Sequence, residues 1–222
     1  MSIASELRNL IRAGVHRIGE LEIQTDIYGY PYVICHFEDA ELSTEPALGG
    51  LDLHEGPGAA RDLSTYAEDG SYRFTKGQTN LKRGWVMALE TEEELRQALD
   101  QFYPAGLGLY LAQRNGTLEV ENLRDKLERQ TGMYRFARGI SDAGAQRLVR
   151  DVCGPGHLCV KRILWKLDAN TPLDDSEASR FDGIPGGLRE NEAIPLLCRE
   201  ACNHFVAECR QVAKAEFEKK DG

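Results

Sequence analysis

Four cysteines in the second half of the sequence form two pairs whose spacing suits a metal centre. Five residues separate Cys153 from Cys159, and three separate Cys198 from Cys202. Cysteine thiolates are the ligands of structural zinc ions and of iron-sulfur clusters. One of the six cysteines lies before this region and five lie within it. The clustering therefore predicts a metal site made of these four side chains.

The gap within each pair bears on which metal binds. Structural zinc sites commonly leave about two to four residues between paired cysteines, whereas the first gap here is five. An iron-sulfur cubane is bulkier than a zinc ion and suits the wider gap better. The spacing favours a [4Fe-4S] cluster, while a zinc site and a site without metal remain open alternatives.

Helices are expected to position both pairs. A helix predicted over residues 141–152 begins with Ser141 as its N-cap. It is closed by Cys153, and the Gly-Pro-Gly sequence that follows allows a sharp turn. A last helix is predicted from about 197 to 219, which places Cys198 and Cys202 one turn apart on the same face. The free amides at that helix start would lower the pKa of both thiols.

The other two cysteines and a nearby histidine are expected to stay outside the metal site. Cys209 follows Cys202 by two helical turns, about 10 Å along a helix axis, and is expected to be a small buried residue. Cys35 lies in a predicted strand and is expected in the core. His157 lies between two candidate ligands in the sequence and is expected to be an exposed loop residue.

Basic and aromatic residues lie close to the cysteines in the sequence. Four cationic side chains would offset the negative charge of a four-thiolate cluster or attract an anionic partner, although each suits a solvated surface equally well. Trp165 is expected in the core, where it would also shield a cluster from water. The four basic residues are Lys161, Arg162, Arg199 and Arg210.

The composition describes a chain able to bury a core of its own. It has 222 residues, of which 28% are charged, and a net charge of -9. No general attraction to nucleic acid or to an anionic membrane is expected from this charge. No apolar run reaches the length of about eighteen residues that a membrane span needs. Without a basic start followed by an apolar run, the sequence predicts a cytoplasmic protein with reduced thiols.

Periodicity predicts an α+β fold, with an N-terminal helix plus a small antiparallel sheet, followed by a mainly helical region. Apolar residues at three- and four-residue steps predict a first helix over residues 2–18. A long loop is expected over residues 38–71. Thr91 and Glu94 form a capping box that starts another helix. Strands are expected over residues 20–25, 32–37, 72–75 and 84–89, and further helices over residues 92–102, 104–113, 121–130, 141–152 and 197–219.

Several segments of the chain resemble a known family. Residues 153–165 and 194–202 are similar to the iron-sulfur domain found attached to some CbiX-type sirohydrochlorin cobaltochelatases. Residues 72–77, 83–85 and 128–134 look like the stabilising domain and the junction of the same family. Together these segments extend the resemblance over most of the chain.

The resemblance implies two domains and a cofactor. Residues 1–115 would form an N-terminal α+β stabilising domain, and residues 116–222 a mainly helical [4Fe-4S] cluster-binding domain. The protein would be an accessory, redox or sensing module in tetrapyrrole metabolism, meaning cobalamin or siroheme synthesis. Its partner would be a separate chelatase or a tetrapyrrole. Carried over by position, the cluster ligands would be Cys153, Cys159, Cys198 and Cys202.

Two other functions remain open. Chelatase activity would need histidines poised over a porphyrin-like ring, and the five histidines of this sequence are scattered, so metal insertion by this chain is not expected. One alternative is an enzyme that acts on a tetrapyrrole and holds its carboxylates with basic side chains. The other is a structural zinc-binding domain. No catalytic motif is recognised, and no catalytic residue is predicted. The basic side chains are Lys76, Lys82, Arg83, Arg135 and Arg138.

Overall fold

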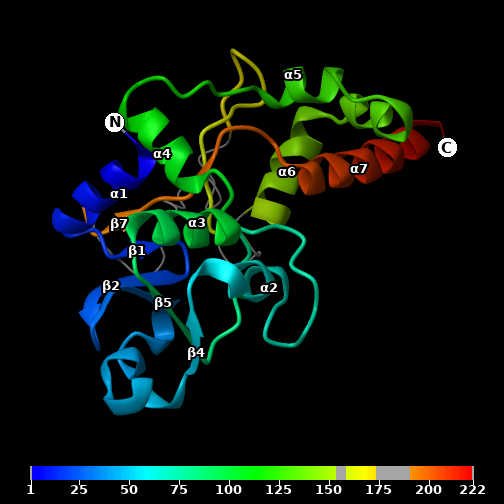
Figure 1. Ribbon diagram of the computed structural model, residues 1–222. Coiled ribbons are helices and arrows are strands. Elements are labelled where there is room, and N and C mark those ends of the chain that lie inside the picture. The colour runs from blue at the N-terminus through cyan, green and yellow to red at the C-terminus, as the bar shows by residue number, and fades with distance from the viewer. Residues whose placement is uncertain (1, 154–158, 174–190, 222) are drawn as a thin grey trace. The chain divides into compact units, whose positions relative to one another are not determined.

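The computed structural model describes residues 2–153, 159–173 and 191–221 (Figure 1). The chain folds into two compact units. The first unit comprises the chain up to Asn115 and a later segment that ends at Leu196, and the second comprises residues 116–182 and the chain from Leu197 onward. Among the described helices, none is both long and apolar enough to cross a membrane.

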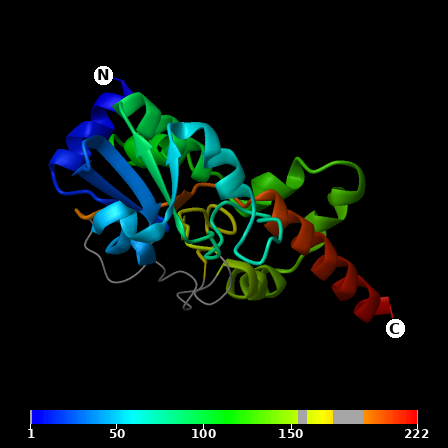
Figure 2. The ribbon, with the colours of Figure 1, turned by 60° about the horizontal axis from the view of Figure 1, so that its bottom comes forward.

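A six-stranded mixed sheet forms the centre of the first unit. Its strands are β1 (Arg17–Ile18), β2 (Leu21–Ile27), β3 (Tyr30–His36), β4 (Asp52–Glu55), β5 (Trp85–Leu89) and β7 (Ala193–Ile194). The strand order is β4-β5-β3-β2-β1-β7, and Figure 2 shows β2 and β3 in blue with β5 in green and β4 in cyan. Strands β5, β3, β2 and β1 pair antiparallel, whereas β4 and β7 pair parallel with their neighbours. The predicted α+β class is confirmed, but the predicted small antiparallel sheet is wrong in part because two parallel edge strands extend it.

The hairpin of β2 and β3 turns at Tyr28 and Gly29. Both residues have positive φ, 51° and 85°, which is the backbone of a two-residue turn whose twist suits a hairpin. The sequence predicts two strands and a turn around the segment Gly29-Tyr30-Pro31. The structure places Tyr30 in β3 already, paired with Ile27.

Four helices accompany this sheet. They are α1 (Ile3–Arg12), α2 (Ala60–Thr65), α3 (Glu92–Phe102) and α4 (Gly106–Arg114). Helices α1, α3 and α4 pack against one another on the same side of the sheet (Figures 1 and 2). The predicted first helix over residues 2–18 is too long, because Gly14 takes a φ of 105° and Arg17–Ile18 pair with β2. Helix α3 starts as predicted, since the Glu94 N–H donates to Thr91 Oγ1 at 3.1 Å.

Both faces of the sheet are buried. On the helix side, Trp85 stacks on Phe102 of α3 with the ring centroids 5.2 Å apart. The next residue, Val86, points to the other face, where it packs with Cys35 and Leu48. The predicted core position of Cys35 is confirmed.

The segment between β3 and β5 differs from its prediction. The long loop expected over residues 38–71 contains β4, α2 and several turns of 3-10 helix. Residues 72–75 form no strand, and Tyr72 makes an isolated bridge with Tyr66 instead. Short apolar stretches between glycines and prolines carry no clear period, which is why the pattern misleads here. The 3-10 turns are Phe37–Asp39, Leu42–Thr44, Pro46–Gly50 and Pro57–Ala59.

The second unit is mainly helical, as predicted. Its elements are α5 (Leu123–Glu128), the 3-10 segment η5 (Gly132–Gly139), α6 (Asp142–Cys153), β6 (Arg162–Ile163), β8 (Leu197–Cys198) and α7 (Asn203–Asp221). Both η5 and α6 pack against α7. The predicted N-cap of α6 is confirmed, because the Gly144 N–H donates to Ser141 Oγ at 3.0 Å. Trp165 lies in the core of this unit, edge-to-face with Phe205 at 5.3 Å between centroids.

Candidate metal centre

The four candidate ligands lie at the ends of elements of the second unit. Cys153 is the last residue of α6, and Cys159 lies shortly before β6. Cys198 is the last residue of β8, and Cys202 directly precedes α7. The Gly-Pro-Gly turn and His157 fall outside the described residues.

The predicted last helix begins too early. Helix α7 starts at Asn203, and Leu197–Cys198 form strand β8 instead. Strand β8 pairs parallel with β6, in a register that puts Ile163 opposite Cys198. Pairing with a strand that is distant in sequence outweighs the helical spacing of the two cysteines. Cys198 and Cys202 therefore do not share a helix face.

Cys198 has a defined set of hydrogen-bond partners. Its carbonyl accepts the Leu164 N–H at 3.0 Å. Its Sγ accepts the Trp165 indole N–H at 3.3 Å and donates to the Glu200 carbonyl at 3.1 Å. Burial raises the pKa of this thiol to about 11, while the Trp165 hydrogen bond and the charge of Lys161 act in the opposite direction. Both of these neighbours favour a thiolate at this position.

Cys202 occupies the N-cap position of α7. Its Sγ accepts the Phe205 N–H at 3.4 Å, and its carbonyl accepts the Val206 N–H at 3.0 Å. A thiolate here meets the free amides and the partial positive charge of a helix start. The helix-start environment predicted for both cysteines is therefore present for Cys202 and absent for Cys198. The Cys202 side chain is also exposed.

Burial and neighbouring thiols raise the pKa values of Cys153 and Cys159. Burial is the main cause that raises the pKa of Cys153, and four neighbouring thiols raise it further. Burial likewise raises the pKa of Cys159, and Lys161 opposes this rise through a backbone hydrogen bond and its charge. The thiols that act on Cys153 are Cys159, Cys198, Cys202 and Cys209.

Within residues 2–153, 159–173 and 191–221, no three His, Cys, Asp or Glu side chains lie close enough together to hold a metal ion. A [4Fe-4S] cluster makes a different demand, because each of its four thiolates binds a different iron atom of the cubane. Cysteine thiolates, one for each iron atom, are the donor set that such clusters take.

Cys209 lies in the hydrophobic core of the second unit. Its side chain is fully buried, and it packs with Phe205, Val206 and Trp165 in one apolar cluster. Burial raises the pKa of its thiol to about 12. The predicted role of Cys209 as a small core residue is confirmed.

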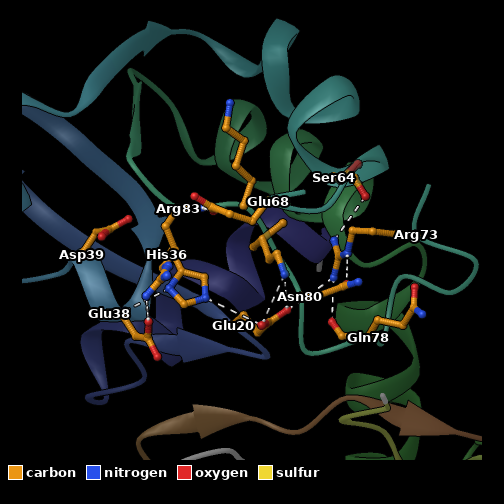
Figure 3. A network of polar contacts seen from close by, with 12 residues as sticks. Glu20, His36, Glu38, Asp39, Ser64, Glu68, Arg73, Gln78, Asn80 and Arg83 are labelled. Carbon is orange, nitrogen blue, oxygen red and sulfur yellow. Dashed lines mark hydrogen bonds and ion pairs between the residues drawn. The ribbon is translucent and has the colours of Figure 1, made fainter. Parts of the chain in front are cut away.

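The first unit contains a buried polar network that sequence patterns do not reveal (Figure 3). The Arg73 side chain is fully buried, and its Nη2 lies 3.3 Å from Glu20 Oε2. Its guanidinium also donates to Asn80 Oδ1 at 2.9 Å and to the carbonyls of Ser64 and Gln78 at 3.2 and 2.7 Å. An arginine in a polar segment without periodicity carries no sequence signal of burial. Each of these contacts is internal, so the network holds the segment that contains Arg73 in place.

Glu20 connects this arginine to the sheet. Its Oε1 lies 3.6 Å from His36 Nε2, and its Oε2 accepts the Leu81 N–H at 3.3 Å. The Glu38 N–H donates to His36 Nδ1 at 3.1 Å. Because Nδ1 accepts a hydrogen bond, the proton of this imidazole is on Nε2, where it faces Glu20.

Five basic side chains are candidates to hold the carboxylates of a tetrapyrrole. Two of them have partners within the protein. Lys76 Nζ donates to the Ser64 carbonyl at 2.6 Å. Arg83 pairs with Glu38 at 2.6 Å. These contacts weigh against a role for Lys76 and Arg83 in holding a carboxylate ligand. The first unit contains Lys76, Lys82 and Arg83, and the second contains Arg135 and Arg138.

Comparison with known proteins agrees with the two-part organisation. Residues 4–113 match the DR2241 stabilising domain, and residues 115–211 match a 4Fe-4S iron-sulfur cluster binding domain. A crystal structure of DR2241 from Deinococcus radiodurans is similar with a TM-score of 0.74 and 25% sequence identity. The likeness covers 96% of this chain and 41% of DR2241, which is described as a multi-domain protein with structural similarity to chelatases and two additional novel domains. The chain thus spans less than half the length of DR2241.

The cofactor of this protein is a [4Fe-4S] cluster, since residues 115–211 match a 4Fe-4S iron-sulfur cluster binding domain. The resemblance noted from the cysteine segments is confirmed. The two matched segments together account for nearly the whole chain, which therefore combines a DR2241 stabilising domain with a 4Fe-4S iron-sulfur cluster binding domain.

Proposed function

We propose that Cys153, Cys159, Cys198 and Cys202 bind the cluster, and that the protein is a redox or sensing accessory module beside a separate chelatase. The assignment is supported by where these cysteines lie within one unit. Cys153 ends α6, Cys159 lies shortly before β6, Cys198 ends the strand β8 that pairs with β6, and Cys202 directly precedes α7. Distant cysteines that converge on one place are the expected framework for a shared cluster.

The surroundings of the sulfurs support this assignment. Three of the four sulfurs accept a hydrogen bond from an N–H group of the chain. Such donors stabilise thiolates and tune the reduction potential of a cluster. A bound cluster supplies a one-electron donor and acceptor, and the chain supplies its ligands, these donors and an apolar wall. The donor–acceptor pairs are Lys161 with Cys159, Trp165 with Cys198, and Phe205 with Cys202.

For the partner we propose a separate chelatase or a tetrapyrrole, in cobalamin or siroheme synthesis. The support is the likeness to DR2241, which is described as similar to chelatases and of which this chain spans 41%. With its four best metal ligands committed to the cluster, this chain is not expected to insert metal. We also propose a cytoplasmic location, which agrees with six cysteines that form no disulfide bond in the described residues. The boundary between the domains 1–115 and 116–222 belongs to this proposal and is supported by the two family matches, which meet near residue 114.

Anaerobic purification with quantitation of iron, sulfide and zinc tests the ligand set. The unaltered protein should be brown, with visible absorption that bleaches on reduction. Cys198→Ser and Cys202→Ser should each lose the cluster, because each removes one thiolate. Cys35→Ser and Cys209→Ser alter buried thiols outside the proposed set and should keep it. Stoichiometric zinc without sulfide contradicts the proposal, and so does a Cys198→Ser protein that keeps a full cluster.

An anaerobic insertion assay tests the accessory role. Purified protein should not load cobalt or iron into sirohydrochlorin by itself. It should instead bind sirohydrochlorin in a titration or a purified chelatase in a sedimentation experiment. Catalytic turnover by this chain alone would show that it is an enzyme. If it binds neither sirohydrochlorin nor the chelatase, the proposed role in tetrapyrrole metabolism is contradicted.

A further inference from the structure

We propose that Trp165 sets the reduction potential of the cluster through its indole N–H, an inference that rests on the proposed ligand role of Cys198. Nε1 of Trp165 lies 3.3 Å from Cys198 Sγ. A hydrogen bond to a sulfur ligand becomes stronger as the cluster gains an electron, because the sulfur then carries more negative charge. The indole N–H therefore stabilises the reduced cluster and raises its potential.

The position of the indole is determined by contacts on two sides. Trp165 follows β6, whose pairing with β8 places Ile163 opposite Cys198. The ring meets Phe205 edge-to-face, with centroids 5.3 Å apart and an interplanar angle of 63°. Phe205 in turn donates its backbone N–H to Cys202 Sγ at 3.4 Å. The indole is thus packed against a residue whose amide serves a second proposed ligand.

Burial makes this donor difficult to replace. Trp165 is 2% exposed, so water has little access to the sulfur side of the ring. If the N–H is removed while the ring is kept, the Cys198 sulfur loses a donor that solvent does not restore. The donors at Lys161 and Phe205 are backbone groups, which side-chain substitution leaves in place. A substitution at position 165 therefore removes one N–H···S bond and leaves every proposed ligand unchanged.

The charge of Lys161 is a separate influence on the same sulfur. It favours the thiolate form of Cys198, and it would also favour the reduced cluster. Its effect differs from that of the indole, because solvent ions screen an ammonium group that is partly exposed. A direct hydrogen bond in a buried site should give a shift that persists at high ionic strength.

Anaerobic redox titration of Trp165→Phe against Trp85→Phe tests the proposal. Trp85 is the matched control, because it is 1% exposed and its Nε1 donates to the Lys82 carbonyl at 2.6 Å in the first unit. Trp165→Phe should retain iron and sulfide and should shift to a lower potential. The expected change is about tenfold in the equilibrium constant for reduction, about 59 mV for a one-electron couple. The shift should persist at high salt, and Trp85→Phe should show none.

A loaded Trp165→Phe protein with an unchanged potential overturns the proposal and leaves the ligand assignment intact. A Cys198→Ser protein that keeps its cluster overturns the ligand assignment itself, so the two failures can be told apart. A second measurement needs no change at position 165. The sequence has two tryptophans, so in a Trp85→Phe chain labelled with 15N-tryptophan the remaining indole is that of Trp165. Electron-nuclear double resonance on the reduced cluster should show coupling to this nitrogen, and its absence overturns the proposal.

Discussion

Arg73 and Glu20 form a buried ion pair in the first unit, with Nη2 and Oε2 3.3 Å apart and the side chains 0% and 6% exposed. Arg73 comes from the irregular segment between α2 and β5, whereas Glu20 lies in the turn between β1 and β2. The pair therefore ties a segment with little regular structure to the sheet (Figure 3).

Replacing Arg73 with methionine should destabilise the protein strongly. The change leaves the Glu20 carboxylate buried without its cation, which costs about 3–5 kcal/mol in the free energy of unfolding. Chemical denaturation measures this loss. Arg83→Met is the control, because Arg83 and Glu38 form an exposed pair whose removal should cost less than about 1 kcal/mol. Equal losses in the two variants would contradict a structural role for the buried pair.

Gly19→Ala should destabilise the first unit more than Gly29→Ala. Both glycines have positive φ, but a Cβ at Gly19 would lie 2.5 Å from Tyr103 Cζ, whereas a Cβ at Gly29 would meet nothing within 4 Å. Gly29→Ala should therefore show the backbone cost alone, about 1–2 kcal/mol. Gly19→Ala should add about 1–3 kcal/mol of overpacking. Similar unfolding free energies for both variants would show that the Tyr103 ring moves aside at little cost.

Ser141→Ala should weaken the connection between α6 and α7. Ser141 Oγ accepts the Gly144 N–H at 3.0 Å and donates to Glu216 at 2.7 Å. Loss of an N-cap costs about 1 kcal/mol. The thermal midpoint of the anaerobic protein with its cluster should fall accordingly. Ser141→Asn supplies both a cap acceptor and a donor and should restore most of the loss, and a failure of asparagine to do so would argue against capping as the cause.

Removal of the cluster should loosen the second unit locally. Amides in residues 159–163 and 197–205 should lose protection from hydrogen exchange, because β6 and β8 are two-residue strands that cannot hold each other without further support. Amides of β2 and β3 in the first unit should keep their protection and serve as the internal reference. Hydrogen exchange on anaerobic protein with and without its cluster measures this difference. Uniform protection in both samples would mean that the metal contributes little to folding.

The chemistry of the centre and the local signals of the fold could be predicted from the sequence. Cysteine type and spacing pointed to an iron-sulfur cluster, and the cluster-binding domain match agrees. The predicted N-caps at Thr91 and Ser141 are confirmed. Such signals can be read along the chain, because a cap and the amides that it satisfies lie within a few residues of each other.

The way in which distant segments meet could not be predicted from the sequence and is seen only in the folded chain. Residues 197–202 have the spacing of a helix, yet Cys198 lies in a strand because Ile163 is paired opposite it. Arg17 pairs with Ala193 across most of the sequence, which adds a parallel edge strand that no local pattern predicts. The burial of Arg73 likewise depends on acceptors from four separate residues, among them Glu20. Local periodicity records which face of an element is apolar, whereas strand partners and buried charges depend on segments that only folding brings together.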